Sequence, residues 1–310
     1  MKKIIVLSVL ALLIAALFLI PVSERISVPV KGPFLNIYTL LSKPEKWEQW
    51  LPSLCEQDTS VSGKFVIKKD TSSFSITNPK AELRVVKNAM TFRVQERTPK
   101  ESTYTYTILP TQSPNKTFIV VYYKTNLFRY LFGRSTGEKT HIYNFKHFLE
   151  TDSLLYGCKI FKTRVPEGNL IVIRKAVPVK AKFNEAHSML TTLQQYVKEH
   201  HLTQMQPVIA QFLPKGKDSA QVNVGLFIDK ETVSAAPVTF VRMPKGGPLY
   251  VARYKGSFNQ RKKVYDGLQQ YFTDHLYQSA ILPFETYLDN KLPTSDTSKI
   301  NIQVNFTTYY

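Results

Sequence analysis

The C-terminal half of the chain contains the tetrapeptide Leu-Gln-Gln-Tyr twice, and this internal repeat restricts the possible folds more than any other feature. The copies begin at Leu193 and Leu268, and each is followed by a proline at nearly the same distance, Pro207 and Pro283. Two similar modules, each with an unpaired sheet edge and an apolar helix face, can bury both by pairing with each other. The repeat therefore predicts a pseudo-twofold domain with a cleft along the seam between its halves.

Strand-like segments flank each copy of the tetrapeptide, one before the helical stretch and one after it. The later segments alternate between apolar and polar side chains, which is typical of strands with one buried face. The four segments are residues 169–175, 221–228, 248–254 and 300–306. This pattern predicts a duplicated α+β domain over residues 157–310, built of repeats at about 157–230 and 237–310.

Residues 25–150 indicate a second domain of different architecture. A strand at residues 26–33 is followed by short helical runs, by alternating strand and turn signals over residues 64–125, and by a final helical stretch. Trp47 and Trp50 stand three residues apart on one helical face, where we expect them to fill the end of a core. The order predicts an antiparallel meander closed by a helix, so the whole chain is expected to be of the α+β class.

The N-terminus has two lysines followed by 17 uncharged, mostly apolar residues, numbers 4–20. This length is at the short edge of what spans a hydrocarbon layer about 30 Å thick, so residues 1–22 are either a transmembrane anchor or a signal peptide. The candidate cleavage site at residues 21–23 is poor, which favours an uncleaved single-pass anchor. Because Lys2 and Lys3 precede the span, we expect a cytoplasmic N-terminus and a periplasmic or extracellular body.

The net charge of +18 is spread evenly along the chain. Residues 25–150 include 19 basic and 10 acidic side chains, and residues 151–310 include 20 basic and 12 acidic ones. Proteins that read nucleic acid usually concentrate basic residues in one stripe or helix. We therefore expect no nucleic-acid partner and a basic surface that is compatible with anionic lipid head groups.

Neither a metal site nor a familiar catalytic motif is indicated by the sequence. The six histidines show no ligand spacing with a nearby carboxylate, and nothing requires a disulfide between the distant Cys55 and Cys158. No GxSxG elbow, glycine-rich phosphate loop or CxxC pair occurs. We therefore expect no cofactor, no metal and no catalytic residue.

The stretch "SKPEKWEQWLPS" after the first strand, together with the order of strands and helices, resembles the START-related superfamily. This superfamily is also called SRPBCC or polyketide-cyclase-like. The resemblance covers about residues 25–150. It implies a helix-grip fold, in which a curved antiparallel sheet wraps around a C-terminal helix with an apolar cavity between them.

The duplicated half resembles the gyrase-inhibitor-like (GyrI-like) small-molecule-binding domain, which is also the effector-binding half of some transcription regulators. In the second copy, "LYVARYKGSF" resembles the family's strand and aromatic turn, with Gly256 and Phe258 in the matching places. "YDGLQQYF" resembles the family's helix, and "LPFETYLDN" resembles the segment that carries a pocket tyrosine, here Tyr287. The two kinds of domain also occur in tandem behind an N-terminal helix in some bacterial proteins.

The GyrI-like family commonly has a glutamate in its last strand, where it can pair with a cationic ligand or assist hydrolysis. The best-aligned position here is Asn301, with Gln303 beyond it on the same face, and an amide supplies neither a negative charge nor a general base. Glu285 is the nearest acidic residue in sequence, and we expect its side chain to face solvent. The resemblance therefore implies a cleft that prefers neutral or weakly polar ligands.

Together these features predict a membrane-anchored binder or sensor of a hydrophobic small molecule that is not an enzyme. A hydrolase or cyclase acting on an apolar molecule, and a scaffold for a protein partner, are the alternatives. Aromatic walls with a few polar groups are typical of small-molecule clefts. The candidate ligand-binding residues are Tyr250, Tyr254, Phe258, Tyr265, Phe284, Tyr287, Asn301 and Gln303.

Overall fold

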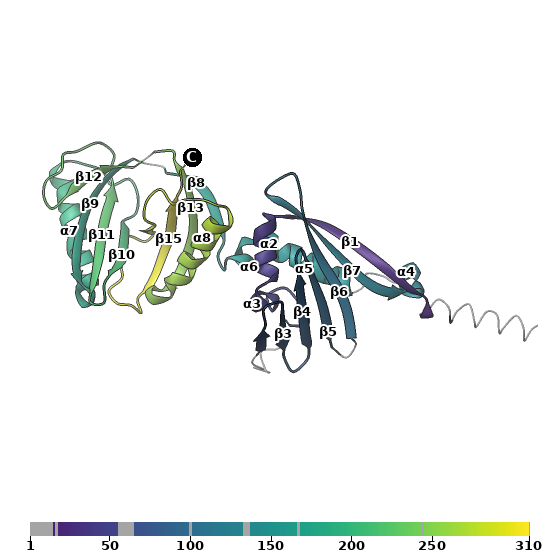
Figure 1. The fold of residues 1–310 in the computed structure, drawn as a ribbon. Helices are drawn as coiled ribbons and strands as arrows, with labels where there is room; N and C mark the ends of the chain where they lie inside the picture. The colour runs from purple at the N-terminus through teal and green to yellow at the C-terminus, as the bar shows by residue number, and fades with distance from the viewer. Residues whose placement is uncertain are drawn as a thin grey trace, which may run out of the picture. The chain divides into compact units, whose positions relative to one another are not determined.

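The chain divides into two compact units, Met1–Leu155 and Tyr156–Tyr310, which we call unit 1 and unit 2. Each unit contains one antiparallel sheet with helices, so the described fold is of the α+β class expected from the sequence (Figure 1). The computed structural model describes residues 15, 18–54, 65–98, 101–132, 137–165, 168–243 and 245–309.

Most of the expected anchor, residues 1–22, lies outside the described residues, and so does Cys55. In the described parts of the chain, no helix is both long enough and apolar enough to cross a membrane. The anchor and the side of the membrane on which the body lies stay predictions.

Unit 1 is a seven-stranded antiparallel sheet with the order β1-β7-β6-β5-β4-β3-β2. The strands β2 to β7 follow one another as the meander expected from the sequence, and β1 completes the sheet beside β7. The strands are β1 (Pro21–Lys31), β2 (Val66–Lys69), β3 (Ser73–Thr77), β4 (Glu82–Asn88), β5 (Thr91–Arg97), β6 (Glu101–Pro110) and β7 (Lys116–Asn126). The helices are α2 (Phe34–Leu41), α3 (Pro44–Trp47), α4 (Leu127–Phe132), α5 (Gly137–Glu150) and α6 (Asp152–Leu155).

Aromatic side chains pack together between this sheet and its helices. Trp47 and Trp50 are buried, as expected, and their ring centroids lie 4.7 Å apart. The ring of Trp50 also lies 4.5 Å from that of Phe145 in α5. Tyr106 of β6 packs edge-on against both tryptophans. These four rings join the sheet to the helices of unit 1.

Unit 2 is an eight-stranded antiparallel sheet with two long helices. Its first half contains β8 (Ile160–Arg164), β9 (Asn169–Pro178), η1 (Val179–Ala181), α7 (Lys182–Glu199), β10 (Ile209–Lys215) and β11 (Ser219–Phe227). Its second half contains β12 (Thr239–Arg242), β13 (Pro248–Ser257), η2 (Phe258–Arg261), α8 (Lys262–Asp274), β14 (Phe284–Tyr287) and β15 (Lys299–Thr307).

The strand order of unit 2 is β12-β9-β11-β10-β14-β15-β13-β8. The central strands β10 and β14 pair with each other, and the same strand pattern runs from this centre to either edge. The edge strands cross between the halves: β8 pairs with β13, and β12 pairs with β9. Each half therefore closes the sheet of the other. That the two halves are copies of one module stays a prediction.

The leucine of each repeated tetrapeptide packs its helix onto this sheet. The helix α7 contacts β9 and β11, and α8 contacts β13 and β15 (Figure 1). Leu193 and Leu268 have no exposed surface. The repeat in the sequence thus marks equivalent packing positions on the two helices.

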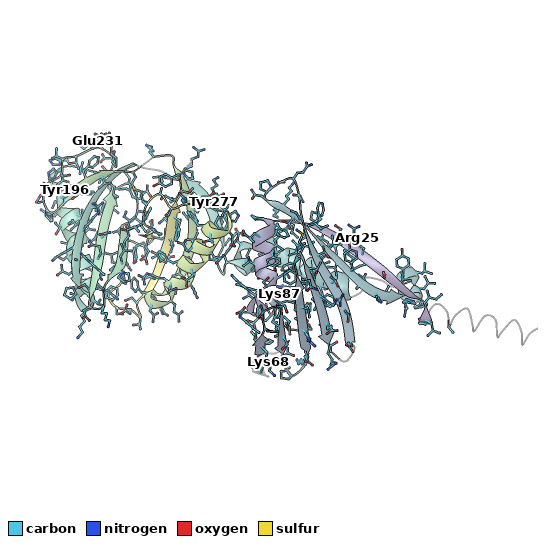
Figure 2. The ribbon with its side chains drawn as sticks, viewed as in Figure 1. Arg25, Lys68, Lys87, Tyr196, Glu231 and Tyr277 are labelled. Atoms are coloured by element: carbon cyan, nitrogen blue, oxygen red, sulfur yellow. The ribbon has the colours of Figure 1, made fainter. Side chains whose placement is uncertain are left out.

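The tyrosine of each tetrapeptide stacks against the C-cap residue of its helix. The C-cap residues His200 and His275 stack on Tyr196 and Tyr271, with ring centroids 3.8 and 4.0 Å apart. Figure 2 labels Tyr196 on α7. The next residue of the chain has a positive φ in both cases, 50° and 55°, as is common just after a helix. The two helices therefore end in the same way.

Gly267 lies on the buried side of α8, close to the start of unit 2. A Cβ at this position would lie 2.3 Å from the carbonyl oxygen of Tyr156 and 3.0 Å from Sγ of Cys158. Because the nearest atom belongs to the backbone, we expect Gly267→Ala to lower the free energy of unfolding of unit 2 by about 1–3 kcal/mol. Hydrogen exchange of β13 and β15 peptides measures this loss. An unchanged or increased stability would contradict the close approach.

Candidate functional site

One face of the unit 2 sheet lies opposite α7 and α8, and we call it the open face. Side chains alternate between the two faces along each strand. Those on the open face form one apolar cluster, with Met243 packed against it: Val165, Leu170, Ile209, Phe227, Leu249, Val251 and Phe284. All seven of these side chains are buried, so they form an apolar floor on this face of the sheet.

Two hollows lie over this apolar cluster, and Phe284 lines both of them. The larger has a volume of about 540 Å³ and lies over β8, β13, β14 and β15. The smaller has a volume of about 250 Å³ and lies over β9, β10, β11 and β12. Small-molecule sites are typically apolar clefts of about 300–1,000 Å³ with a few placed polar groups. The larger hollow alone meets this description.

A Gln-Val-Asn sequence places the same amide pair beside each hollow. In β11, Gln221 donates a hydrogen bond to the side-chain oxygen of Asn223 at 3.1 Å, and in β15, Gln303 donates to Asn305 at 2.9 Å. Each asparagine in turn donates to a side-chain oxygen on the adjacent central strand, at 2.7 and 2.9 Å. A fixed polar network therefore borders the apolar cluster in both halves.

Glu285 is fully buried under α8, so the expectation that it faces solvent is wrong. Its carboxylate accepts hydrogen bonds from Nε of Arg261 at 2.5 Å and from the hydroxyls of Tyr265 and Tyr287 at 2.9 and 2.5 Å. The strand β14 lies between β10 and β15, and alternation along it turns Phe284 to the open face and Glu285 to the helix side. A buried carboxylate requires a cation and hydrogen-bond donors, which η2, α8 and β14 supply here.

The groups around Glu285 leave its charge compensated and enclosed. Burial first, and the charge of Glu285 second, raises the pKa of Tyr265 and of Tyr287 well above its usual value, so both hydroxyls remain protonated donors. The guanidinium of Arg261 lies 3.4 Å from the ring centroid of Phe258 and donates to the carbonyl oxygen of that residue at 3.0 Å.

The structure divides the eight candidate residues between the two faces of the sheet. Phe284 and Gln303 line the larger hollow, and Asn301 lies on the same side of β15 as Gln303 but outside the lining of either hollow. The remaining five lie on the helix side: Tyr250, Tyr254, Phe258, Tyr265 and Tyr287. As contacts of a ligand, all eight stay predictions.

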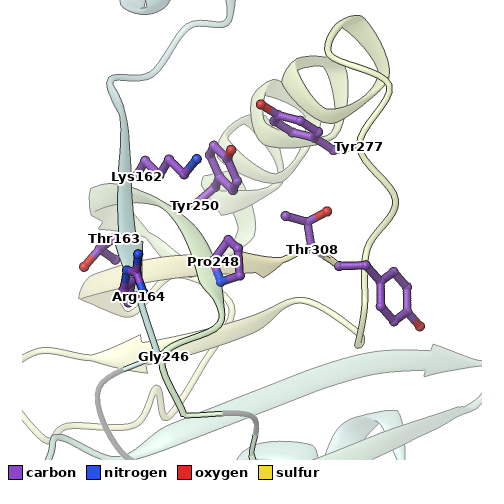
Figure 3. Close-up of a pocket in the computed structure, with 9 residues that line it drawn as sticks. Lys162, Thr163, Arg164, Gly246, Pro248, Tyr250, Tyr277 and Thr308 are labelled. Carbon is purple, nitrogen blue, oxygen red and sulfur yellow. The ribbon is translucent and has the colours of Figure 1, made fainter.

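A third hollow, of about 550 Å³, lies at the β8 edge of the sheet (Figure 3). Its lining includes Lys162, Tyr250 and Tyr277, and Nζ of Lys162 lies 5.6 Å from the ring centroid of Tyr250. A hydrogen bond with Tyr250 raises the pKa of Tyr277. Only Tyr250 is buried among the residues that line it, whereas the larger hollow of the open face has a buried apolar floor. We therefore place the candidate site on the open face.

Three arginines of the open face were absent from the candidate residues: Arg164, Arg174 and Arg253. Arg174 in "NLIVIRK" and Arg253 in "PLYVARY" hold the same place in the two copies of the repeat. A Gln-Val-Asn triplet also occurs in each half, shifted by two residues relative to the arginine. A residue-by-residue comparison of the two copies is the signal that points to these positions.

Among the residues that the structure describes, no group of three or more His, Cys, Asp or Glu side chains could hold a metal ion. No family model matches the chain, and no curated protein matches it significantly.

Several solved structures are similar to the chain at low identity. The C-terminal domain of EcmrR is 18% identical, with 49% of this chain and 98% of that domain covered and a TM-score of 0.40. EcmrR in a complex with DNA is 16% identical, with 56% and 71% covered and a TM-score of 0.40. A hydrolase from Listeria innocua is 12% identical, with 52% and 98% covered and a TM-score of 0.37. Similarity at this level assigns no function to the chain.

Proposed function

We propose that unit 2 binds a hydrophobic small molecule on its open face and does not catalyse a reaction on it. The observation that carries this proposal is the apolar cluster of the open face, which forms the floor of a hollow of about 540 Å³. Buried apolar groups supply affinity in such sites, and a few polar groups at the border orient the ligand. The amide pair of Gln303 and Asn305 has that position.

We further propose that unit 2 is a GyrI-like effector-binding domain made of two repeats. The order strand, helix, strand, strand occurs twice, as β9, α7, β10 and β11 and as β13, α8, β14 and β15, and supports this assignment. Unit 1 would be the START-related domain, with an antiparallel sheet and a C-terminal helix, behind an N-terminal membrane anchor. The body of the protein would then act as a tethered binder or sensor outside the cytoplasm.

Hydrolysis or cyclisation of an apolar substrate is the alternative function. It needs a titratable group at the ligand, and among the residues that the structure describes, no Asp, Glu or His lines either hollow of the open face. Glu285 belongs to the opposite side of the sheet, and its hydrogen bonds come from protein groups. A binding function therefore has the better support. A scaffold for a protein partner has no specific observation in its favour.

Filling the larger hollow tests the proposed site. Gln303 lines this hollow and is only partly buried, so we expect Gln303→Trp to weaken binding of an apolar probe by tenfold or more while the unit stays folded. The probe is N-phenyl-1-naphthylamine, a neutral dye whose fluorescence rises in apolar surroundings. A fluorescence titration of the full chain gives the dissociation constant.

Gln221→Trp is the matched control. Gln221 holds the same place in the first Gln-Val-Asn triplet, makes the same kind of hydrogen bond, and does not line either hollow. We expect this variant to bind the probe within twofold of the original chain. Equal losses in the two variants, or no saturable binding by the original chain, would refute the site.

A further inference from the structure

We propose that the ligand of the open face is an amphiphilic anion, in which an apolar body carries one carboxylate or phosphate group bound by Arg253 at the larger hollow. This inference rests on the proposed function, because it specifies the chemical class of the molecule that the open face binds. It differs from the neutral ligand that the sequence led us to expect.

Arginine side chains line both hollows of the open face, and the described residues of these linings include no Asp or Glu. Arg164 and Arg253 line the larger hollow, and Arg174 lines the smaller one. Within the described part of the chain, the arginines that pair with carboxylates are others: Arg97, Arg242 and Arg261. An anionic group that enters either hollow therefore meets a guanidinium that no described carboxylate neutralises.

Arg174 and Arg253 each lie opposite one member of the neighbouring amide pair. Arg174 lies opposite Asn223 in the β9–β11 pairing, and Arg253 lies opposite Gln303 in the β13–β15 pairing. Each guanidinium thus borders the apolar cluster from an outer strand. A guanidinium presents several donors in a planar fork that matches two oxygens of a carboxylate or phosphate.

The neighbouring amides are already used by the protein, which leaves the arginines as the groups that can bind the charge. Asn305 donates to the carbonyl oxygens of Phe284 and Gln303 and to the hydroxyl of Thr286. Gln303 donates to the side-chain oxygen of Asn305. These bonds fix the polar border of the cleft.

A cationic ligand lacks an equivalent partner on this face. Glu285 is the carboxylate of the central strand β14, but it lies on the helix side of the sheet. Its charge is compensated by Arg261 at 2.5 Å. In its described residues, the lining of the open face therefore presents arginine without a matching carboxylate, and the apolar cluster is available to the uncharged part of an anionic amphiphile.

General basicity of the chain is the competing explanation, because a net charge of +18 attracts anions to any part of the surface. Lone exposed ion pairs contribute little, since water and salt screen them. An arginine beside an apolar body that excludes water should contribute more. If general basicity explains anion binding, the loss of any one positive charge should weaken it equally. If the open face binds the anion, only the loss of an arginine on that face should weaken it.

Two dyes with the same skeleton separate charge from apolar contact. 1-Anilinonaphthalene-8-sulfonate carries one sulfonate that N-phenyl-1-naphthylamine lacks, and the sulfonate stands in for the carboxylate or phosphate. We expect the full chain to bind the sulfonate at least tenfold more tightly. Arg253→Gln should weaken sulfonate binding about fivefold, and Arg174→Gln, at the smaller hollow, should change it by less than twofold. Binding of the neutral dye should stay within twofold in both variants.

Lys198→Gln is the matched control for charge. Lys198 is exposed on α7, on the other side of the sheet, and its removal changes the net charge by the same amount as Arg253→Gln. We expect it to change sulfonate binding by less than twofold. Hydrogen exchange of the variants verifies that the sheet of unit 2 remains folded.

Three twelve-carbon competitors then define the head group. We expect dodecanoate or dodecyl phosphate to displace the sulfonate dye at a lower concentration than dodecanol does, and the stronger of the two anions identifies the head group. Three results would overturn the inference: equal affinities for the two dyes, equal competition by dodecanol, or equal effects of Lys198→Gln and Arg253→Gln. In each of these cases, saturable binding of the neutral dye would still support the proposed function. If neither dye binds saturably, the proposed function fails as well.

Discussion

Glu285→Gln should lower the free energy of unfolding of unit 2 by about 3–5 kcal/mol, the usual cost of removing one partner from a buried ion pair. Glutamine keeps the shape of the side chain, but Tyr265 and Tyr287 donate to different oxygens of Glu285, so the single amide oxygen can accept only one of these hydrogen bonds in place. It leaves the guanidinium of Arg261, whose side chain is 17% exposed, without a counter-charge. Hydrogen exchange of β14 and β15 peptides, measured by mass spectrometry, gives the change in free energy.

The double variant Glu285→Gln with Arg261→Gln is the control for this interpretation. Removing both charges should cost less than removing Glu285 alone, because no uncompensated charge remains. Both tryptophans of the chain lie in unit 1, so their fluorescence reports the unfolding of unit 1 as an internal reference. A loss below about 1 kcal/mol for Glu285→Gln would contradict a buried ion pair.

Leu193→Ala and Leu268→Ala should each destabilise unit 2 by about 2–5 kcal/mol. Both side chains are completely buried at equivalent positions of α7 and α8, so truncation removes apolar contacts and leaves a cavity. Chemical denaturation followed by far-ultraviolet circular dichroism, together with hydrogen exchange of the adjoining strands, measures the two losses.

The next residue of each tetrapeptide supplies a matched control. Gln194 and Gln269 are exposed on the same helical turns, and we expect Gln194→Ala and Gln269→Ala to change stability by less than about 0.5 kcal/mol. Losses below about 1 kcal/mol for both leucine variants would mean that the repeated tetrapeptide does not mark a shared packing position.

Local patterns in the sequence were sufficient to predict most of the helices and strands. The alternation in residues 221–228 and 300–306 corresponds to β11 and β15, and the meander signals correspond to the successive strands of unit 1. The repeated tetrapeptide indicated two similar helices, and its leucines, Leu193 and Leu268, are buried in α7 and α8. These features depend on residues close together in the chain, which is why they can be recognised without coordinates.

The burial of Glu285 depends on contacts that a local pattern does not contain. Arg261 and Tyr265 lie 24 and 20 residues earlier in the chain, and they reach the carboxylate only because η2 and α8 pack over β14. The strand itself has four residues, too few for alternation to show which side is covered. The pairing of β8 with β13 and of β12 with β9 is equally non-local.

Sequence patterns predicted only part of the candidate site, for a related reason. Aromatic residues were chosen as walls of a cleft, but five of them pack under the helices, since an aromatic side chain suits a core as well as a pocket. The arginines of the open face were overlooked because a basic residue in a strongly basic chain gives no signal by itself. Their significance comes from the apolar cluster beside them.

The most direct test of ligand binding on the open face is a crystal structure of the full chain with 1-anilinonaphthalene-8-sulfonate. We expect the aromatic rings of the dye to lie on Phe284 and Val251, with the sulfonate beside Arg253. Dye bound only in unit 1, or only in the hollow at the β8 edge of the sheet, would contradict a binding site on the open face.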